Sequence, residues 1–280
     1  MYRITTLGLF LLSLLSFRCS QEEKYNNPSD YDLSKPQQIK LPLELDEISG
    51  LSFFDKDTSV FAINDERGWL YKLGVGSHRS ITRWKFSPGA DFEDVVLHDS
   101  VFYILQSNGT IFRVEARANG ISPATEIPFQ YNQENEFESL YWDDEKKKLI
   151  LICKDCEFDK KRSLTTFSFD PATGQFSDQS FSIKVDSIAA SVGEKKIKFK
   201  PSAAAINPAD SLLYIVSAIN KMIVVTDRNG NFKKVYHTPS LFKQAEGITF
   251  APNGTMIISN EAADVGVADI LIFPRRKVKP

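Results

Sequence analysis

The feature that most limits what this chain can fold into is a repeat with a period of about 44 residues. Its units align at residues 49, 93, 138, 202 and 246, so the steps along the chain are 44, 45, 64 and 44 residues. A run of β-branched and aromatic residues that ends abruptly in polar ones follows each aligned position, as in residues 60–63 before Asn64 and Asp65. Buried strands and tight turns that recur about every 40 to 50 residues are typical of β-propeller blades.

The length of the repeated segment sets the number of blades. Residues 38–277 hold five units of 44 residues plus about 20 more in the third unit, between residues 159 and 198, which we interpret as an extra strand pair. We therefore predict an all-β fold, a five-bladed β-propeller, with six blades as the alternative if the extra residues form a degenerate blade. Too few strands follow Glu246 to complete the last blade, so the N-terminal strand near residues 38–41 is expected to close the ring and remove an open sheet edge.

The N-terminal residues are predicted to be a targeting segment. In residues 1–19 a basic start precedes an apolar stretch that is too short to span a bilayer, as in a signal peptide. Cys19 follows it, as in the lipobox of bacterial lipoproteins, although Arg18 stands where the lipobox has a small residue. We expect Cys19 to be lipidated, with an ordinary secretory signal or an uncleaved anchor as the alternatives.

A lipid on Cys19 would anchor the protein to the outer membrane of a bacterial cell envelope, on the periplasmic or the outer side. The polar residues 20–37 then form a tether between the membrane and the propeller. The chain carries 34 basic and 36 acidic side chains, and this balance argues against a nucleic-acid partner.

The repeat gathers carboxylates at one end of the propeller. In this fold the inner strand of each blade begins, and the second strand ends, at the same face. Glu93, Glu138 and Glu246 begin inner strands, so we predict that they surround one mouth of the central channel and bind a metal. Further channel-mouth contacts are expected from Asn64, Asp65, Asp94, Gln106, Lys154, Asn260 and Glu261.

Carboxylates that face one axis repel each other unless they are protonated, hydrated or share a cation. A site made of oxygen ligands without clustered His or Cys suits a hard ion, and a flexible shell suits Ca²⁺ better than Mg²⁺. We therefore predict Ca²⁺ at the mouth, in a functional or a purely structural role. The alternative is an acidic, hydrated mouth that holds no metal.

Several strings, in this order, resemble the SdiA-regulated family of bacterial propellers: Asp46-Glu47-Ile48-Ser49-Gly50-Leu51, Asp91-Phe92-Glu93-Asp94-Val95, Phe137-Glu138-Ser139-Leu140, Ala245-Glu246-Gly247-Ile248 and Ser259-Asn260-Glu261. The resemblance covers about residues 40–273. It implies a five-bladed propeller distantly similar to NHL-repeat proteins, with a calcium site and no established activity, and with Glu93, Glu138 and Glu246 as ligands. The fourth blade departs from the pattern, because it carries Ser202 and Ala203 where an acidic residue and Gly are expected.

The Cys and His residues limit the kinds of function that the sequence supports. Cys153 and Cys156 are expected to form a disulfide or to remain two free thiols, since neither a redox setting nor further zinc ligands accompany them. None of the three His residues is expected at the mouth, so a general base is missing there. We therefore favour a non-catalytic module that binds an unknown ligand or envelope protein. A Ca²⁺-dependent hydrolase of esters, lactones or phosphoesters, using a metal-bound water, is the alternative, and a structural envelope protein is the third.

Overall fold

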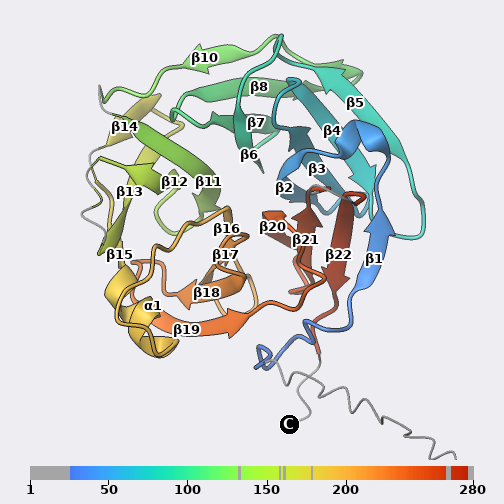
Figure 1. Ribbon diagram of the computed structural model, residues 1–280. Helices are drawn as coiled ribbons and strands as arrows, with labels where there is room; N and C mark the ends of the chain where they lie inside the picture. The colour runs from blue at the N-terminus through green and yellow to red at the C-terminus, as the bar shows by residue number, and fades with distance from the viewer. Residues whose placement is uncertain are drawn as a thin grey trace, which may run out of the picture.

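The computed structural model describes residues 26–131, 134–157, 159, 162–177, 179–262 and 266–276. Five small antiparallel sheets stand around a common axis, which confirms the predicted five-bladed β-propeller (Figure 1). Among these residues no helix is long and apolar enough to cross a bilayer. The predicted signal peptide, with Cys19, lies outside the described residues.

Each blade begins with the strand nearest the axis and proceeds outward. In blades 1 to 5 the inner strands are β2 (Ile48–Phe54), β6 (Phe92–His98), β11 (Asn135–Asp143), β16 (Ala203–Ile206) and β20 (Ala245–Phe250). The second strands are β3 (Ser59–Asn64), β7 (Val101–Gln106), β12 (Lys148–Cys156), β17 (Leu213–Ser217) and β21 (Met256–Asn260). The third strands are β4 (Trp69–Gly74), β8 (Ile111–Arg117), β13 (Ser163–Asp170), β18 (Met222–Thr226) and β22 (Asp269–Phe273).

The outer edge of each blade is less regular. The outer strands of blades 1 to 5 are β5 (Ile81–Lys85), β10 (Thr125–Ile127), β14 (Gln175–Ser177), β19 (Phe232–His237) and β1 (Gln37–Lys40). Two short strands, β9 (Gly120–Ile121) and β15 (Ser182–Lys184), pair with the third strands of blades 2 and 3. The helical elements of the described residues are a 3-10 turn, η1 (Leu43–Leu45), and the short helix α1 (Val185–Ser191).

The apolar runs in the sequence become the buried middle strands. Every residue of β3, β17, β18, β21 and β22 is buried, whereas β5 is mostly exposed. The core lies between the faces of adjacent blades, as where Phe61 of blade 1 meets Phe102 of blade 2 with ring centroids 4.6 Å apart. Packing of sheet against sheet all around the ring fixes the five inner strands and therefore the geometry at the axis.

The ring closes as predicted. β1 pairs antiparallel with β22, with Gln37 opposite Ile272 and Lys40 opposite Asp269, so the first strand of the chain is the outer strand of the last blade (Figure 1). The pairing covers an edge of β22 that would otherwise expose its backbone groups.

The second half of the predicted tether packs against the propeller. Tyr31 and Leu33 are fully buried in the core between blades 4 and 5. The Tyr31 hydroxyl donates a hydrogen bond of 2.6 Å to the carbonyl oxygen of Gly254. The expectation of a polar tether over residues 20–37 is therefore wrong from about residue 28 onward, because two isolated apolar side chains in a polar segment supply enough burial to dock it.

The extra residues of blade 3 differ from the predicted strand pair. β14 pairs with residues 168–170 of β13, and β15 pairs with residues 163–165 of the same strand. The outer edge of this blade is thus shared by two short strands that lie end to end, and α1 follows the second. The prediction of extra structure between residues 159 and 198 is correct in place, but its form is a split edge strand and one helix.

Candidate functional site

The motif that repeats in the sequence is a β-bulge in the inner strand. The ladder skips a residue between Phe92 and Asp94, between Phe137 and Ser139, and between Ala245 and Gly247. Glu93, Glu138 and Glu246 are the residues skipped. A bulge turns its extra residue out of the ladder and is common beside functional sites. Blade 4 pairs regularly from Ala203 onward, in line with its departure from the motif.

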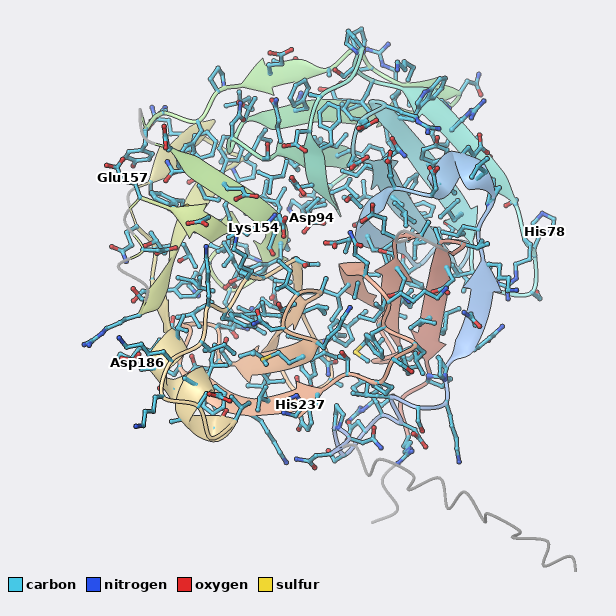
Figure 2. All side chains as sticks on the ribbon, viewed as in Figure 1. His78, Asp94, Lys154, Glu157, Asp186 and His237 are labelled. Carbon is cyan, nitrogen blue, oxygen red and sulfur yellow. A yellow bond between two sulfur atoms is a disulfide. The ribbon has the colours of Figure 1, made fainter. Side chains whose placement is uncertain are left out.

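A lysine balances the predicted ligand of blade 3. The Lys154 ammonium lies 2.7 Å from Glu136 Oε1 and is also ion-paired with Glu138. Figure 2 shows Lys154 close to the centre of the ring. The Lys154 side chain is only 17% exposed, so this pair is shielded from water and its attraction is strengthened. The Glu138 carboxylate therefore already has a cation and is not available in the way that we predicted.

Four other carboxyl groups at the mouth titrate far above their ordinary range. Burial raises the pKa of Glu93 to about 8 and the pKa of Glu246 to about 7. Burial and the charge of Glu47 raise the pKa of Asp65 to about 7. Burial, followed by the charges of Glu246 and Glu47, raises the pKa of Glu261 to about 7. The charge of Glu246 acts on Glu93 and Glu261, so these groups share one electrostatic environment. The charge of Lys154 lowers the pKa values of Glu93 and Glu246, but burial outweighs it.

Glu47, whose charge acts on Asp65 and Glu261, joins these four groups in what we call the acidic cluster. Two carboxylate oxygens of the cluster, Glu47 Oε2 and Asp65 Oδ1, are buried without a hydrogen-bond partner in the described part of the chain. The side-chain oxygen of Asn260, a fully buried residue, also lacks a hydrogen-bond partner among the described residues. The Glu261 carboxylate, in contrast, accepts a hydrogen bond from the side-chain amide of Gln244. Buried polar atoms in folded proteins are normally paired, so such acceptors at one mouth indicate room for a cation or a donor.

Sequence reasoning missed Glu47. It occupies the position just before the motif, where the other blades carry Asp91, Glu136, Lys200 and Gln244. A polar residue at this point in every blade was the available indication that a second ring of side chains borders the mouth.

Asp94 does not lie at the mouth, in contrast to the prediction. It is only 3% exposed, and its carboxylate accepts hydrogen bonds of 2.8 Å from the backbone amides of Val95 and Leu140. A Cβ atom on Gly50 would lie 2.7 Å from the Cα atom of Asp94, so the small residue leaves space for close approach. Burial raises the pKa of Asp94 well above its ordinary value. Asp94 ties blade 2 to the neighbouring blade 3 close to the axis, where Figure 2 places it.

The predicted amide contacts mostly shape loops. Asn64 is fully buried, and its side-chain oxygen accepts from the Arg67 amide. Asn260 donates from its side-chain nitrogen to Asp269 at 2.7 Å. Gln106 is half-buried at the end of β7. The structure thus places Asp65, Glu93, Glu246 and Glu261 in the acidic cluster and gives Asn64 and Asp94 other roles.

The cluster does not form a finished metal site. Within the described ranges, the one group of three His, Cys, Asp or Glu ligand atoms that lie within 4.8 Å of one another belongs to Cys153, Cys156 and Asp159. Its two sulfur atoms are joined in a disulfide, with Cα atoms 5.7 Å apart, so they offer no thiolate. Among the described residues, no three carboxylate groups at the mouth have oxygen atoms within 4.8 Å of one another. A cation there would need water or a small change of side-chain rotamer to complete its shell.

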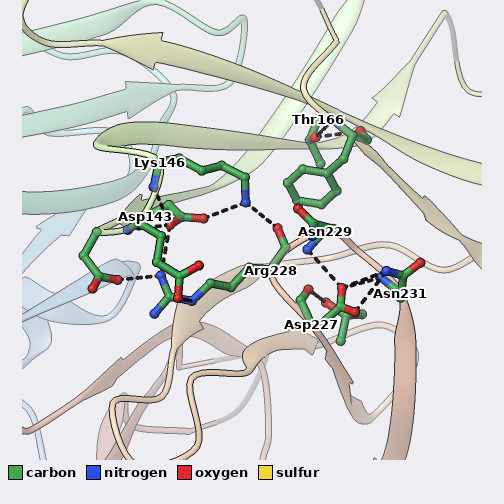
Figure 3. A network of polar contacts seen from close by, with 11 residues as sticks. Asp143, Lys146, Thr166, Asp227, Arg228, Asn229 and Asn231 are labelled. Atoms are coloured by element: carbon green, nitrogen blue, oxygen red, sulfur yellow. Dashed lines mark hydrogen bonds and ion pairs between the residues drawn. The ribbon is translucent and has the colours of Figure 1, made fainter.

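A second charged network lies at the opposite face and joins blades 3 and 4 (Figure 3). Arg228, in the turn after β18, binds Asp143 at 3.0 Å and Asp144 at 2.5 Å. Lys146 binds Asp143 at 2.9 Å and donates to the Arg228 carbonyl oxygen at 2.7 Å. Arg228 and the acids pair with each other, so this network is a structural clamp.

Solved structures share the fold. The glutaminyl cyclase of Myxococcus xanthus is 14% identical with a TM-score of 0.57, over 86% of this chain and 96% of that one. Regucalcin of Agrobacterium tumefaciens, described as a calcium-binding protein, is 13% identical with a TM-score of 0.51, over 90% and 96% of the two chains. A luciferin-regenerating enzyme is 12% identical with a TM-score of 0.52, over 85% and 95%. At such identities the likeness shows the fold alone.

A comparison with curated protein sequences gives no match. The model of one protein family, described as SdiA-regulated, matches residues 28–264, which is most of the chain and includes all five inner strands. The match agrees with the resemblance carried by the bulge motifs. This protein belongs to the SdiA-regulated family.

Proposed function

We propose that this protein is a lipid-anchored, non-catalytic binding module of the bacterial cell envelope that binds Ca²⁺ at the acidic mouth of its propeller. The observation that carries the proposal is the pair of buried carboxylate oxygens without a partner among the described residues, Glu47 Oε2 and Asp65 Oδ1. They belong to a group of acidic side chains whose mutual repulsion a divalent cation would relieve.

The ligand set that we propose differs from the sequence-based one. Blade 1 supplies Glu47 and Asp65, and blade 5 supplies Glu246 and Glu261, with Glu93 of blade 2 close enough to respond to Glu246 and Asp65. Glu138 stays with Lys154. Ca²⁺ tolerates irregular shells of six to eight oxygen atoms and keeps water ligands, which suits a cluster that does not converge on one point. The ion would supply positive charge where the first and last blades meet.

The positions of the His residues favour binding over hydrolysis. His98 stacks on Trp142 at the far face, with ring centroids 3.6 Å apart. His78 lies in the loop before β5, and His237 ends β19 (Figure 2). No imidazole of the described chain is therefore near the acidic cluster to act as a general base. The similar structure that is described as calcium-binding is consistent with an ion in this fold.

Calorimetry on the chain from Ser20 onward, which contains every described residue, tests the proposal. After treatment with a chelator, titration with CaCl₂ should show saturable binding that MgCl₂ reproduces only weakly. Asp65→Asn and Glu261→Gln should each weaken Ca²⁺ binding by about tenfold or more, which corresponds to about 1.4 kcal/mol. Glu126→Gln, an exposed change on β10, should leave it unchanged. Absence of Ca²⁺ binding in the wild type would refute the proposed site.

Two further measurements address catalysis and anchoring. The first is an assay with a panel of esters, lactones and phosphoesters. If the protein hydrolyses any of them in a Ca²⁺-dependent reaction that Asp65→Asn abolishes, it is a hydrolase and not a non-catalytic binding module. Cells that express the full chain should incorporate labelled palmitate into it, and Cys19→Ser should abolish the label. A wild-type chain that remains unlabelled would rule out the lipid anchor.

A further inference from the structure

A cavity opens at the end of the channel opposite the acidic mouth. Its volume is about 510 Å³, within the range of small-molecule sites, and all five blades line it. The last or next-to-last residues of the inner strands form a ring of large apolar side chains around it: Phe53, Leu97, Trp142, Ile206 and Phe250. All but Phe250 are partly exposed, so this apolar funnel faces solvent.

Buried residues of the inner strands line the side of the funnel that is nearest the acidic mouth. Leu51, Val95 and Leu140 line its floor, and the Asp94 carboxylate accepts hydrogen bonds from the amides of Val95 and Leu140. Asp94 thus stands between the funnel and the acidic cluster. A ligand in the funnel would not need the acidic mouth, so the two sites are separable by experiment.

The walls are held in place by ring packing. Trp142 stacks on His98 with an interplanar angle of 20°, and Phe250 meets Tyr214 edge to face with centroids 5.3 Å apart. Such contacts leave the rings little freedom, so the apolar surface is formed before any ligand binds.

Backbone amides give the funnel its polar character. An inner strand pairs on one side only, so alternate amides on its other edge face the channel. In two blades the preceding blade supplies an acceptor for such an amide. Ser52 Oγ accepts from the Leu97 amide at 2.9 Å, and Thr249 Oγ1 accepts from the Phe53 amide at 3.1 Å.

The other side of the funnel lacks this bond in two blades. Val96 and Ala205 occupy the positions that correspond to Ser52 and Thr249, and neither side chain has an acceptor atom. The amides of Trp142 and Phe250, which correspond to those of Leu97 and Phe53, are therefore left without a side-chain acceptor from the preceding blade. A ligand oxygen could take that place.

The charged side chains at the rim of the funnel do not favour a charged ligand. Arg228 lines the funnel but is paired with Asp143 and Asp144, and its side chain is only 11% exposed. Asp55, also at the rim, is exposed to water. A ligand that fills this space with a net charge would gain little from either group.

We propose that the apolar funnel binds a compact, uncharged molecule with an apolar body and a carbonyl-type oxygen that accepts from the amide of Trp142 or Phe250. The ring of apolar side chains holds the body, and the amide orients the oxygen. The site is distinct from the Ca²⁺ site that we propose at the other mouth.

The naphthyl ketone dye Prodan is a suitable probe, because it is uncharged, aromatic and carries one carbonyl oxygen. Added to the chain from Ser20 onward, it should show saturable binding with a blue-shifted emission. Ala205→Phe, which fills the funnel, should abolish that binding. Ala172→Ser, an exposed change in the turn after β13, should not affect it. Binding should persist in excess chelator, which separates this site from the Ca²⁺ site.

Two conservative variants test the role of the amides. Val96→Thr and Ala205→Ser each place a hydroxyl where Ser52 and Thr249 have theirs, so the protein itself would satisfy the amide. The double variant should bind Prodan about three- to tenfold more weakly, the value of one neutral hydrogen bond. It should bind the carbonyl-free parent dimethylaminonaphthalene as the wild type does. Equal weakening of both compounds would refute the amide contact, and binding that survives Ala205→Phe in a variant shown to be folded by circular dichroism would refute the site.

Discussion

Replacement of Glu246 by Gln should change how the stability of the protein depends on pH. Burial raises the pKa of Glu246 from its ordinary 4.5 to about 7, so the folded state holds this proton more tightly than the unfolded state does. Wherever the folded state binds more protons, the free energy of unfolding falls as pH rises. The contribution of Glu246 is therefore lost progressively between about pH 4.5 and pH 7 and stays lost above that.

The size of this effect follows from the same change in pKa. The full rise corresponds to about 3 kcal/mol at about 1.4 kcal/mol per tenfold change in proton affinity. Because the unfolded state is already partly ionised at about pH 5, roughly 2 kcal/mol of the loss falls between about pH 5 and pH 8. Gln has nearly the shape of Glu and keeps an oxygen for the neighbouring donors Ser202 and Gln244. Without Ca²⁺, Glu246→Gln should therefore be more stable than the wild type by about 3 kcal/mol at pH 8 and by only about 1 kcal/mol at pH 5.

Urea unfolding at the two pH values in the presence of a chelator measures this difference. Glu126→Gln, on the exposed edge of blade 2, is the control and should follow the wild type at both. Saturating Ca²⁺ should narrow the difference at pH 8, because the ion binds the wild type, with its full ligand set, more tightly than Glu246→Gln. The free energies of unfolding of Glu246→Gln and the wild type could instead differ by the same amount at both pH values, or the variant could be the less stable at pH 8. Either result would show that ionisation of the buried Glu246 carboxyl group does not destabilise the folded protein as we predict.

Three further predictions concern the mouth and the interior. Ca²⁺ affinity should rise from about pH 6 to pH 8, because protons compete with the ion for carboxyl groups whose pKa values lie near 7 to 8. A constant or falling affinity in calorimetry over this range would contradict the prediction. Lys154→Met should tighten Ca²⁺ binding by about five- to tenfold, because it removes a competing cation and frees the Glu138 carboxylate. Weaker Ca²⁺ binding in this variant would show instead that Lys154 supports the site. Tyr31→Phe should lower the free energy of unfolding by about 1 to 2 kcal/mol, because it removes a buried hydrogen bond to Gly254. Tyr141→Phe should not lower it, because the buried Tyr141 hydroxyl has no hydrogen-bond partner in the described chain. Equal losses of stability in urea unfolding would refute this distinction.

The fold could be predicted because its information is local and repeated. Each blade carries the same apolar run, turn and motif, and the spacing of positions 49, 93, 138, 202 and 246 already implies five copies. The docking of Tyr31 and Leu33 could not be predicted in this way. Two apolar side chains in a polar stretch show no periodicity, and their partners lie in blades 4 and 5, at the other end of the chain.

The site was predictable only in its location. The motif placed Glu93, Glu138 and Glu246 at bulges near one mouth, but it could not show which charges pair. Glu138 meets Lys154 across a hairpin whose register the bulge itself alters, so a count along the sequence does not reveal the contact. Asp94 was misplaced because adjacent residues at a bulge point in different directions, and its carboxylate turns down the channel to backbone amides.

The pairing of β1 with β22 also has a consequence for how the chain reaches its native state. Gln37 and Ile272 are neighbours in the finished ring but belong to the first and the last strand of the propeller. The contact that completes blade 5 therefore cannot form until every strand between β1 and β22 has been synthesised, and long-range contacts of this kind form slowly. Until then both strands have unpaired edges, which are templates for association with other chains. The step most exposed to misassembly is thus ring closure, and the buried side chains of Tyr31 and Leu33 add a second attachment that retains the closing strand once it has docked.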